Sequence, residues 1–274
     1  MNKTFIFLLC FSCNVLAYPV WDITLPGGQH FHMIGSTHLG VTGIPPVPAT
    51  LIDQVKKANA LITEVNTDDG PEINQQETIL PLSKASPDNL ARVLTKDELS
   101  KLRMICMALN IDCNKLGRMS FWQVGILLDQ KQVRLLGFTH KDNIDSLLIH
   151  LARQNNKRII SLEDQHTVSS LFKKLSEPDT GANFLRDNIL YRTSHIQMIR
   201  KTMNLWLNNL PEKVDDIPYA IHSDEIGNLI LHDRNKRWSQ KLKTLPEGNY
   251  VVVVGVAHLI GPDNLITELQ KTNS

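Results

Sequence analysis

The sequence predicts an α/β fold with a central, mostly parallel sheet, an N-terminal hairpin and a large helical insertion. Three observations lead to this prediction. Residues 249–255 include four consecutive valines, and a run without alternation is typical of a strand buried on both faces. Residues 30–65 have the pattern strand, loop, helix, strand, which is a βαβ unit and implies a parallel pair of strands. Strand and helix patterns then alternate toward the end of the chain.

The first half of the chain supplies the hairpin, the βαβ unit and the insertion. Residues 20–24 and 30–34 have the pattern of two strands, and the Pro-Gly-Gly turn between them is a hairpin signal. A helix at 49–59 and a buried strand at 60–65 follow. From about residue 75 to residue 132 the pattern is mostly helical, so we place the insertion there.

The second half continues the alternation of strands and helices. No linker divides the chain, so residues 18–274 are expected to form one α/β domain. The expected elements are a short strand at 133–138, a helix at 143–155, a strand at 158–162, a helical stretch at 165–209, a helix at 226–242, the strand at 249–255 and a short helix at 261–270.

Composition and charge exclude several classes of protein. Of the 274 residues, 42% are hydrophobic and 21% are charged, which is an ordinary globular mixture. Lys and Arg total 29 and Asp and Glu total 28, giving a formal net charge of +1. Such a balance argues against a general nucleic-acid binder and against a polybasic membrane-surface protein.

Residues 1–17 have the pattern of a cleavable signal peptide. Lys3 supplies the positive start, and the apolar run at 4–16 is too short to span a bilayer core of about 30 Å. Ala17 has the small side chain that a signal peptidase accepts, so we expect cleavage after it and a periplasmic or secreted protein. An uncleaved N-terminal anchor and a lipoprotein site at Cys13 are the alternatives. No later run reaches membrane-spanning length without charges, so no transmembrane segment is expected after signal removal.

Two cysteines remain after removal of the signal peptide. They are Cys106 and Cys113, and an even pair in an oxidising compartment suggests a disulfide. On one continuous helix they would lie about 10 Å apart along the axis, too far to bond. Asn110 is expected to break that helix and to let the chain fold back. Two buried free thiols are the alternative, and the spacing is not that of a zinc ribbon.

A Gly-x-x-His motif follows both the first and the last core strand. These motifs end in His38 and His258, and Glu64 comes at the end of a third strand. Because parallel strands present their carboxyl ends on one edge, we expect the three side chains to meet there. Two imidazoles and a carboxylate suit a divalent metal with open positions, and such a metal lowers the pKa of bound water. For each histidine alone, a helix-capping or core role is the alternative.

Other candidates are less specific. Arg234 could hold a carboxylate or stabilise an oxyanion, and a surface role on a charged helix is the alternative. Glu163 follows a predicted strand and would join the same edge, while helix capping accounts for Asp145. Six further histidines show no ligand spacing: His140, His150, His166, His195, His222 and His232.

Taken in order, these motifs resemble the TraB/GumN family, which is related to the Tiki proteases and to the pheromone-shutdown protein PrgY. The resemblance covers nearly all of the chain after residue 17, and its most specific parts are the two Gly-x-x-His motifs and the glutamate between them. The matching segments are IGSTHL at 34–39, LITEVN at 61–66, Ile144-Asp145, Ser161-Leu162-Glu163, DRNKRW at 233–238 and VGVAHLIG at 254–261.

The resemblance implies an α/β fold and metal-dependent peptidase activity. By this analogy His38, Glu64 and His258 hold a divalent metal, manganese or cobalt first, with zinc as a further candidate. Glu64 also has a catalytic role, and Arg234 and Asn235 match the Arg-Asn pair of the family and line the site. Peptides or proteins are the implied substrates.

The sequence therefore predicts an exported metal-dependent hydrolase, a peptidase whose metal-activated water is held by two histidines and a glutamate. Two other functions stay open. A non-catalytic periplasmic binding protein could use the same residues to sequester a peptide, a metal or a haem. An enzyme-derived scaffold that has lost its activity would also retain the motifs.

Overall fold

The computed structural model describes residues 18–41, 46–66, 90–140, 143–208 and 216–271. A five-stranded sheet forms its centre, in the order β1-β2-β5-β3-β4. β1 is antiparallel to β2, and the other neighbours are parallel. The predicted fold class, with its hairpin and mostly parallel sheet, is confirmed. The strands are β1 (Val20–Thr24), β2 (Gln29–Ser36), β3 (Ala60–Thr63), β4 (Arg158–Ser161) and β5 (Gly248–Gly255).

Some predictions fall outside the described residues. The signal peptide at 1–17 is one of them, and so is the beginning of the helical insertion at 75–89. Of the helices that are described, none combines the length and the apolar character needed to cross a membrane.

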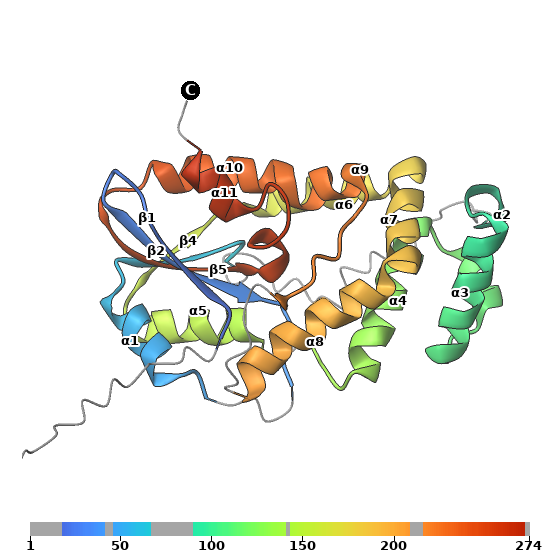
Figure 1. Ribbon diagram of the computed structural model, residues 1–274, viewed down its shortest axis with the longest axis horizontal. Helices are drawn as coiled ribbons and strands as arrows, with labels where there is room; N and C mark the ends of the chain where they lie inside the picture. Colours follow the sequence, from blue (N-terminus) through green and yellow to red (C-terminus); the bar gives the residue numbers. More distant parts are fainter. Residues whose placement is uncertain (1–17, 42–45, 67–89, 141–142, 209–215, 272–274) are drawn as a thin grey trace, which may run out of the picture.

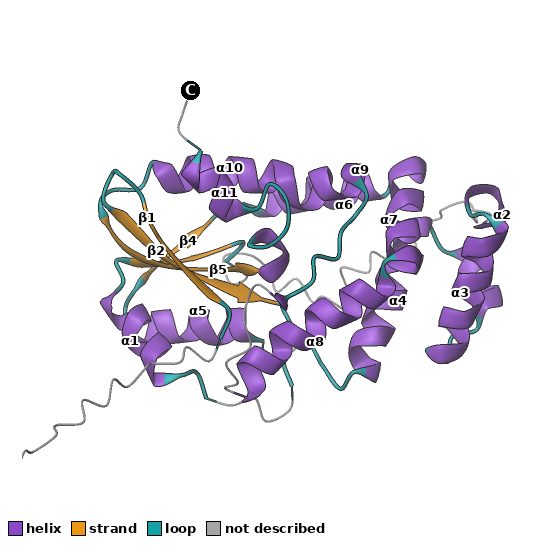
Figure 2. Cartoon of the chain, in the orientation of Figure 1, coloured by secondary structure: helices purple, strands orange, loops and turns teal. Residues whose placement is uncertain are grey.

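Helices cover both faces of the sheet (Figures 1 and 2). α1 (Ala49–Lys57) and α5 (Ile144–Gln154) pack on one face, and α10 (Asp233–Lys243) and α11 (Leu265–Gln270) pack on the other. The result is a three-layer arrangement in which β5 is the middle strand.

The valine run of β5 contributes side chains to the hydrophobic cores on both faces of the sheet. Val252 and Val254 belong to the core under α10 and α11, and Val251 and Val253 belong to the core under α1 and α5. Side chains alternate between the faces of a strand, so each face receives two valines. All four are at most 1% exposed, as expected for a strand with helices on both sides.

A second helical body lies beyond one end of the sheet. α3 (Lys96–Ala108), α4 (Phe121–Leu135) and α7 (Pro178–Leu190) share a hydrophobic cluster that is separate from the two faces of the sheet. Figure 1 shows this body at the end of the sheet away from the hairpin turn. α3 begins with a capping box formed by Thr95 and Glu98.

The remaining helices subdivide two stretches that the sequence predicted as helical. The predicted stretch at 165–209 contains three helices, and the predicted helix at 226–242 is interrupted by one turn of π-helix. These elements are α6 (Gln165–Leu175), α7, α8 (Arg192–Asn208), α9 (Asp224–Gly227) and the π-helix η3 (Asn228–His232), with α2 (Leu90–Val93) and the 3-10 helices η1 (Cys113–Arg118) and η4 (Val256–His258) elsewhere in the chain.

The predicted strand at 133–138 is wrong. α4 continues to Leu135, and Gly137 ends the turn that follows with a φ of 82°. Only an isolated bridge between Gly40 and Thr139 remains of the expected strand pairing. A short apolar run cannot distinguish a buried helix end from a strand by its period, and here the helix formed.

The predicted break at Asn110 is present. Asn110 adopts a left-handed φ of 52°, a conformation that asparagine tolerates better than most residues. The chain then turns back and brings the Cα atoms of Cys106 and Cys113 to 5.7 Å. Their sulfur atoms lie 2.15 Å apart, which is a disulfide-bonding distance.

Candidate functional site

The carboxyl ends of three parallel strands lie side by side. Ser36 at the end of β2 pairs with Gly255 at the end of β5, and β3 ends beside them on the other side of β5. The residues that follow these strands are therefore delivered to one edge of the sheet, as the sequence predicts. The structure brings together there all five predicted site residues: His38, Glu64, Arg234, Asn235 and His258.

Glu64 is at the centre of this cluster. Its Oε1 accepts a hydrogen bond of 2.7 Å from the backbone N–H of Gly255, and its Oε2 accepts one of 2.8 Å from Arg234 Nη2. The same Oε1 lies 3.3 Å from His38 Nε2 and 3.8 Å from His258 Nε2. Burial raises the pKa of Glu64, but Arg234 and the two imidazoles outweigh it and hold that pKa well below its usual value. Glu64 is therefore a carboxylate at neutral pH.

His38 faces a carboxylate through each ring nitrogen. Nε2 lies 3.3 Å from Glu64 Oε1, and Nδ1 lies 3.3 Å from Asp145 Oδ1. Ser36 Oγ donates a 3.0 Å hydrogen bond to the same Asp145 oxygen. Burial lowers the pKa of His38, but Asp145 and Glu64 together overcome it and hold the pKa well above its usual value. His38 is therefore an imidazolium at neutral pH, and it has an unusual left-handed φ of 53°.

His258 has the opposite environment. Its Nδ1 lies 2.7 Å from Asn235 Oδ1, and because an amide oxygen only accepts, Nδ1 carries the hydrogen. Asn235 is itself fixed by a hydrogen bond from Nδ2 to the carbonyl of Asp263. Burial lowers the pKa of His258 to about 3, and the nearby charge of Arg234 contributes to this shift. His258 is therefore a neutral imidazole whose Nε2 accepts a 3.1 Å hydrogen bond from Arg234 Nη1.

Arg234 connects the members of the cluster. Nε donates to Glu163, Nη2 donates to Glu64 and approaches Glu163 within 3.0 Å, and Nη1 donates to the carbonyl of Ile230 and to His258. A guanidinium has five N–H groups, and these contacts engage all five. The expected role of Arg234 as an oxyanion stabiliser gains no support from this arrangement. Its observed role is to hold the two glutamates and the neutral imidazole in place.

Two further carboxylates contact this cluster, and the sequence predicts the position of only one of them. Glu163 was expected at this edge and is there, bonded to Arg234. The sequence predicts a helix-capping role for Asp145. In the structure Asn143 caps α5 by accepting from the N–H of Ser146, and Asp145 pairs with His38 instead. An asparagine two residues before Asp145, in a favoured capping position, was the signal for this division of roles.

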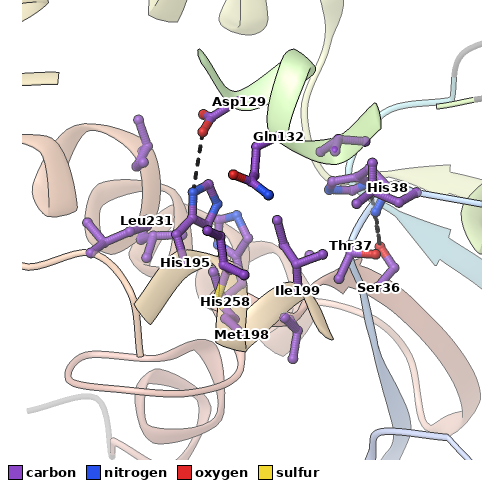
Figure 3. Close-up of a pocket in the computed structure, with 18 of the residues that line it drawn as sticks. Ser36, Thr37, His38, Asp129, Gln132, His195, Met198, Ile199, Leu231 and His258 are labelled. Carbon is purple, nitrogen blue, oxygen red and sulfur yellow. Dashed lines mark hydrogen bonds and ion pairs between the residues drawn. The ribbon is translucent and has the colours of Figure 1, made fainter. Parts of the chain in front are cut away.

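A cavity of about 320 Å³ opens onto the cluster. His38, Glu64, Arg234 and His258 line one part of it, and α4 and α8 line another. In Figure 3, His38 and His258 come from different sides of the site. Glu64 Oε1 lies 3.3 Å from Nε2 of His38 and 3.8 Å from Nε2 of His258. The side chain of His38 is 46% exposed, against 4% for that of His258, so a ligand in the cavity meets His38 first.

Two histidines without ligand spacing also line this cavity. They are His140 and His195, and the pair formed by His195 with Asp129 is drawn in Figure 3. Arg192 and Gln132 lie on the same helices, three residues from His195 and Asp129 respectively. Helices far apart in the sequence present these residues to one space, so only the tertiary packing could reveal them.

The divalent ion implied by the resemblance does not fit the cluster as it is arranged. The separations of 3.3 Å and 3.8 Å from Glu64 Oε1 to the two imidazoles are near the roughly 3.4 Å between neighbouring ligands of a tetrahedral ion. However, Arg234 already donates to Nε2 of His258, and Oε1 of Glu64 already accepts from the N–H of Gly255. Among the residues that the structure describes, no three His, Cys, Asp or Glu side chains form a group that could hold a metal ion.

The motifs agree with comparisons against known proteins. The model of the TraB/PrgY/gumN family matches residues 19–274. The chain belongs to the TraB/PrgY/gumN family. Two relatives, from Escherichia coli (strain K12) and Shigella flexneri, are each called "Uncharacterized protein YbaP" and are 33% identical over 254 residues, which is 92% of this chain and 92% of each relative. No solved structure gives a significant match.

Gly255 is the glycine of the second Gly-x-x-His motif, and a substitution there tests how closely the cluster packs around it. A Cβ at this position would lie 3.1 Å from His38 Nε2 and 3.3 Å from Glu64 Oε1. Because Asp145 and Arg234 hold those two groups, we expect Gly255→Ala to lower the free energy of unfolding by about 1–3 kcal/mol. Gly117→Ala is the matched control, since its Cβ would meet nothing within 4 Å. Equal urea denaturation midpoints for the two variants would contradict the expected crowding of the new Cβ against His38 and Glu64.

The protonation states of the two motif histidines can be measured by NMR with ¹⁵N-labelled histidine. We expect His38 to carry hydrogen on both nitrogens at neutral pH and His258 to carry it on Nδ1 alone, for the electrostatic reasons above. Glu64→Gln removes one of the two carboxylates beside His38 and should lower its pKa. A protonated His258 at neutral pH would refute the assignment.

The raised pKa of His38 also predicts a pH dependence of stability. Its folded pKa lies above the unfolded value of about 6.5, so the stabilisation is complete below about pH 6.5 and is lost as the pH rises through the folded pKa. The difference in unfolding free energy between the native chain and His38→Gln should therefore shrink toward alkaline pH. Urea titrations over that range measure it, and a difference that grows with pH would contradict the charged state of His38.

Proposed function

We propose that the chain is an exported hydrolase of the peptidase class, with His38 and Glu64 as its acid and base. The observation that carries this proposal is the 3.3 Å contact between His38 Nε2 and Glu64 Oε1 in the lining of the cavity. An imidazolium beside a carboxylate provides one group that can give a proton and one that can accept it. The resemblance to Tiki-type proteases supports peptides as the substrate class.

In this proposal Glu64 Oε1 orients the attacking water and accepts its proton. The N–H of Gly255 and the guanidinium of Arg234 keep the carboxylate fixed and ionised. The same contacts make Glu64 a weak base, so the reaction also needs a strong acid on the leaving group. His38 is the proposed acid, because it is protonated and is the more exposed of the two imidazoles.

The other members of the cluster are proposed as positioning residues. Arg234 fixes Glu64, and His258 accepts from Arg234 while Asn235 fixes the His258 ring. A geometry held by such contacts reduces the rearrangement that is required at the moment of reaction. Each of these residues therefore acts through Glu64 in the proposed reaction.

The metal ion stays a prediction of the resemblance. A manganese, cobalt or zinc ion would need the Nε2 lone pair of His258, to which Arg234 donates, so no step proposed here depends on one. Retention of hydrolysis after chelation and dialysis is the expected result. Loss of activity with EDTA, and its recovery with manganese, would contradict the roles assigned to the side chains.

Hydrolysis can be tested with a library of internally quenched peptides. We expect Glu64→Gln to reduce kcat/KM by about 100-fold or more, because it removes the base but keeps the shape of the side chain. Glu247→Gln is the matched control, since Glu247 is exposed and precedes the opposite end of β5. The rate should also fall as the pH rises through the raised pKa of His38, which then loses the proton it donates. Stoichiometric peptide uptake without any product would favour the non-catalytic binding protein instead.

Export is part of the same proposal and has its own test. The predicted signal peptide should be removed after Ala17, so the protein isolated from its source should begin at Tyr18. Tyr18 is buried in the structure, stacked on Trp206 with ring centroids 5.4 Å apart. N-terminal sequencing or intact mass measures the start. A chain that retains residues 1–17 would contradict cleavage.

A further inference from the structure

The acid-base cluster of His38, Glu64, Arg234 and His258 shares its cavity with a polar pair from each of two helices. α4 contributes Asp129 and Gln132, and α8 contributes Arg192 and His195. Residues three apart share a helix face, so the four side chains form two facing contacts. His195 Nδ1 lies 3.4 Å from Asp129 Oδ1, and Arg192 Nη2 donates to Gln132 Oε1. Figure 3 shows Asp129 and Gln132 on one helix above His195.

Arg192 is paired differently from the other arginine in this cavity. Arg234 has two carboxylate partners, Glu64 and Glu163, and all its N–H groups are engaged. The hydrogen bond of Arg192 is to the neutral amide oxygen of Gln132, and no carboxylate among the described residues forms an ion pair with it. Among the described residues, Gln132 is the one hydrogen-bond acceptor of this guanidinium, so its remaining N–H groups have no other described acceptor.

The charges on this wall favour an anion. Asp129 is negative, but it is paired with His195, whose pKa is raised by Asp129 in spite of burial. Arg192 adds a further positive charge to this wall; burial lowers its pKa, and the charge of Asp129 acts in the opposite direction. A partly buried guanidinium without a carboxylate partner is best satisfied by a bidentate anion such as a carboxylate.

The cavity that Arg192 lines also has many apolar side chains. They include Leu39, Val133, Ile196, Met198, Ile199 and Leu231. At about 320 Å³ the cavity is at the small end of ligand pockets, which range from about 300 to 1,000 Å³. It suits a short segment that carries an apolar side chain next to its anionic group.

We propose that Arg192 is a specificity residue that binds a peptide carboxylate lying beside an apolar side chain. This inference rests on the proposed function, because it names the substrates of the same cavity: short peptides that expose such a carboxylate. Gln132 orients the guanidinium, and Asp129 forms its ion pair with His195. The carboxylate can come from the C-terminus of a peptide or from an acidic side chain.

Calorimetric titration of the mature protein tests this proposal with three probes. They are N-acetyl-Ala-Leu with a free carboxylate, the same peptide as its C-terminal amide, and N-acetyl-Asp-Leu-amide, in which the carboxylate is on a side chain. We expect at least one of the two carboxylate probes to bind about tenfold or more tightly than the plain amide, since charge-assisted hydrogen bonds are about twice as strong as neutral ones. Which probe gains identifies the source of the carboxylate.

The variants separate recognition from folding. Arg192→Gln should remove the preference for the carboxylate, and Arg192→Lys should keep part of it because the charge remains. Arg200→Gln is the matched control on the same helix, because Arg200 is exposed and does not line the cavity. Unfolding curves of all three variants show whether the fold is retained, and Arg192→Lys keeps the test decisive if Arg192→Gln does not fold.

Two outcomes would overturn the inference. One is equal affinity of the native protein for all three probes, and the other is a carboxylate preference that survives in Arg192→Gln. Chromatography of the probes after titration reports cleavage separately. Carboxylate preference without cleavage of any peptide would support the binding site and count against the proposed hydrolysis. Cleavage of a peptide without any preference for the carboxylate would support the proposed hydrolysis and count against the binding site.

Discussion

The ion pairs of one partly buried arginine hold the site together. Arg234 reaches Glu64 after β3, Glu163 after β4 and His258 after β5, so its guanidinium links the ends of three strands. Burying a charge is costly unless it is paired, and removing one partner leaves the others uncompensated. The π-helical turn before α10 contributes to this arrangement, because its Ile230 carbonyl takes one of the Arg234 N–H groups. The π-helical interruption therefore helps to position the Arg234 side chain, on which the cluster depends.

The two Gly-x-x-His motifs show how one sequence pattern serves two chemical states. His38 has carboxylates at both nitrogens and is charged, whereas His258 has an amide oxygen at one nitrogen and a guanidinium at the other and is neutral. This difference bears on the metal ion that the family resemblance implies, since a ligating imidazole must offer a lone pair. In this arrangement the lone pair of His258 is directed at Arg234, and both nitrogens of His38 face anions.

The proposed chemistry and the proposed recognition come from different parts of the fold. The acid-base cluster is fixed at the edge of the sheet, where backbone pairing sets the positions of the strand ends. Another part of the cavity lining comes from α4 and α8, whose positions depend on packing between helices. Rigid strand ends suit groups that must stay in register, and a wall of helices can vary in its side chains without disturbing them. The proposed assignment of substrate selection to Arg192 follows this division.

The sequence by itself determined the hairpin, the buried valine strand, the break at Asn110 and the strand-end positions of His38, Glu64 and His258. These features depend on local signals: side-chain alternation, turn residues and the shared edge of parallel strands. Only the tertiary structure decided the four hydrogen-bond partners of Arg234, the pairing of Asp145 with His38, and the meeting of Arg192 and His195 with Asp129 and Gln132. It also replaced the strand expected at 133–138 by the end of a helix. The physical reason is that hydrophobic periodicity reports which face of an element is buried, whereas the partner of a polar side chain depends on distances between elements that are remote in the sequence.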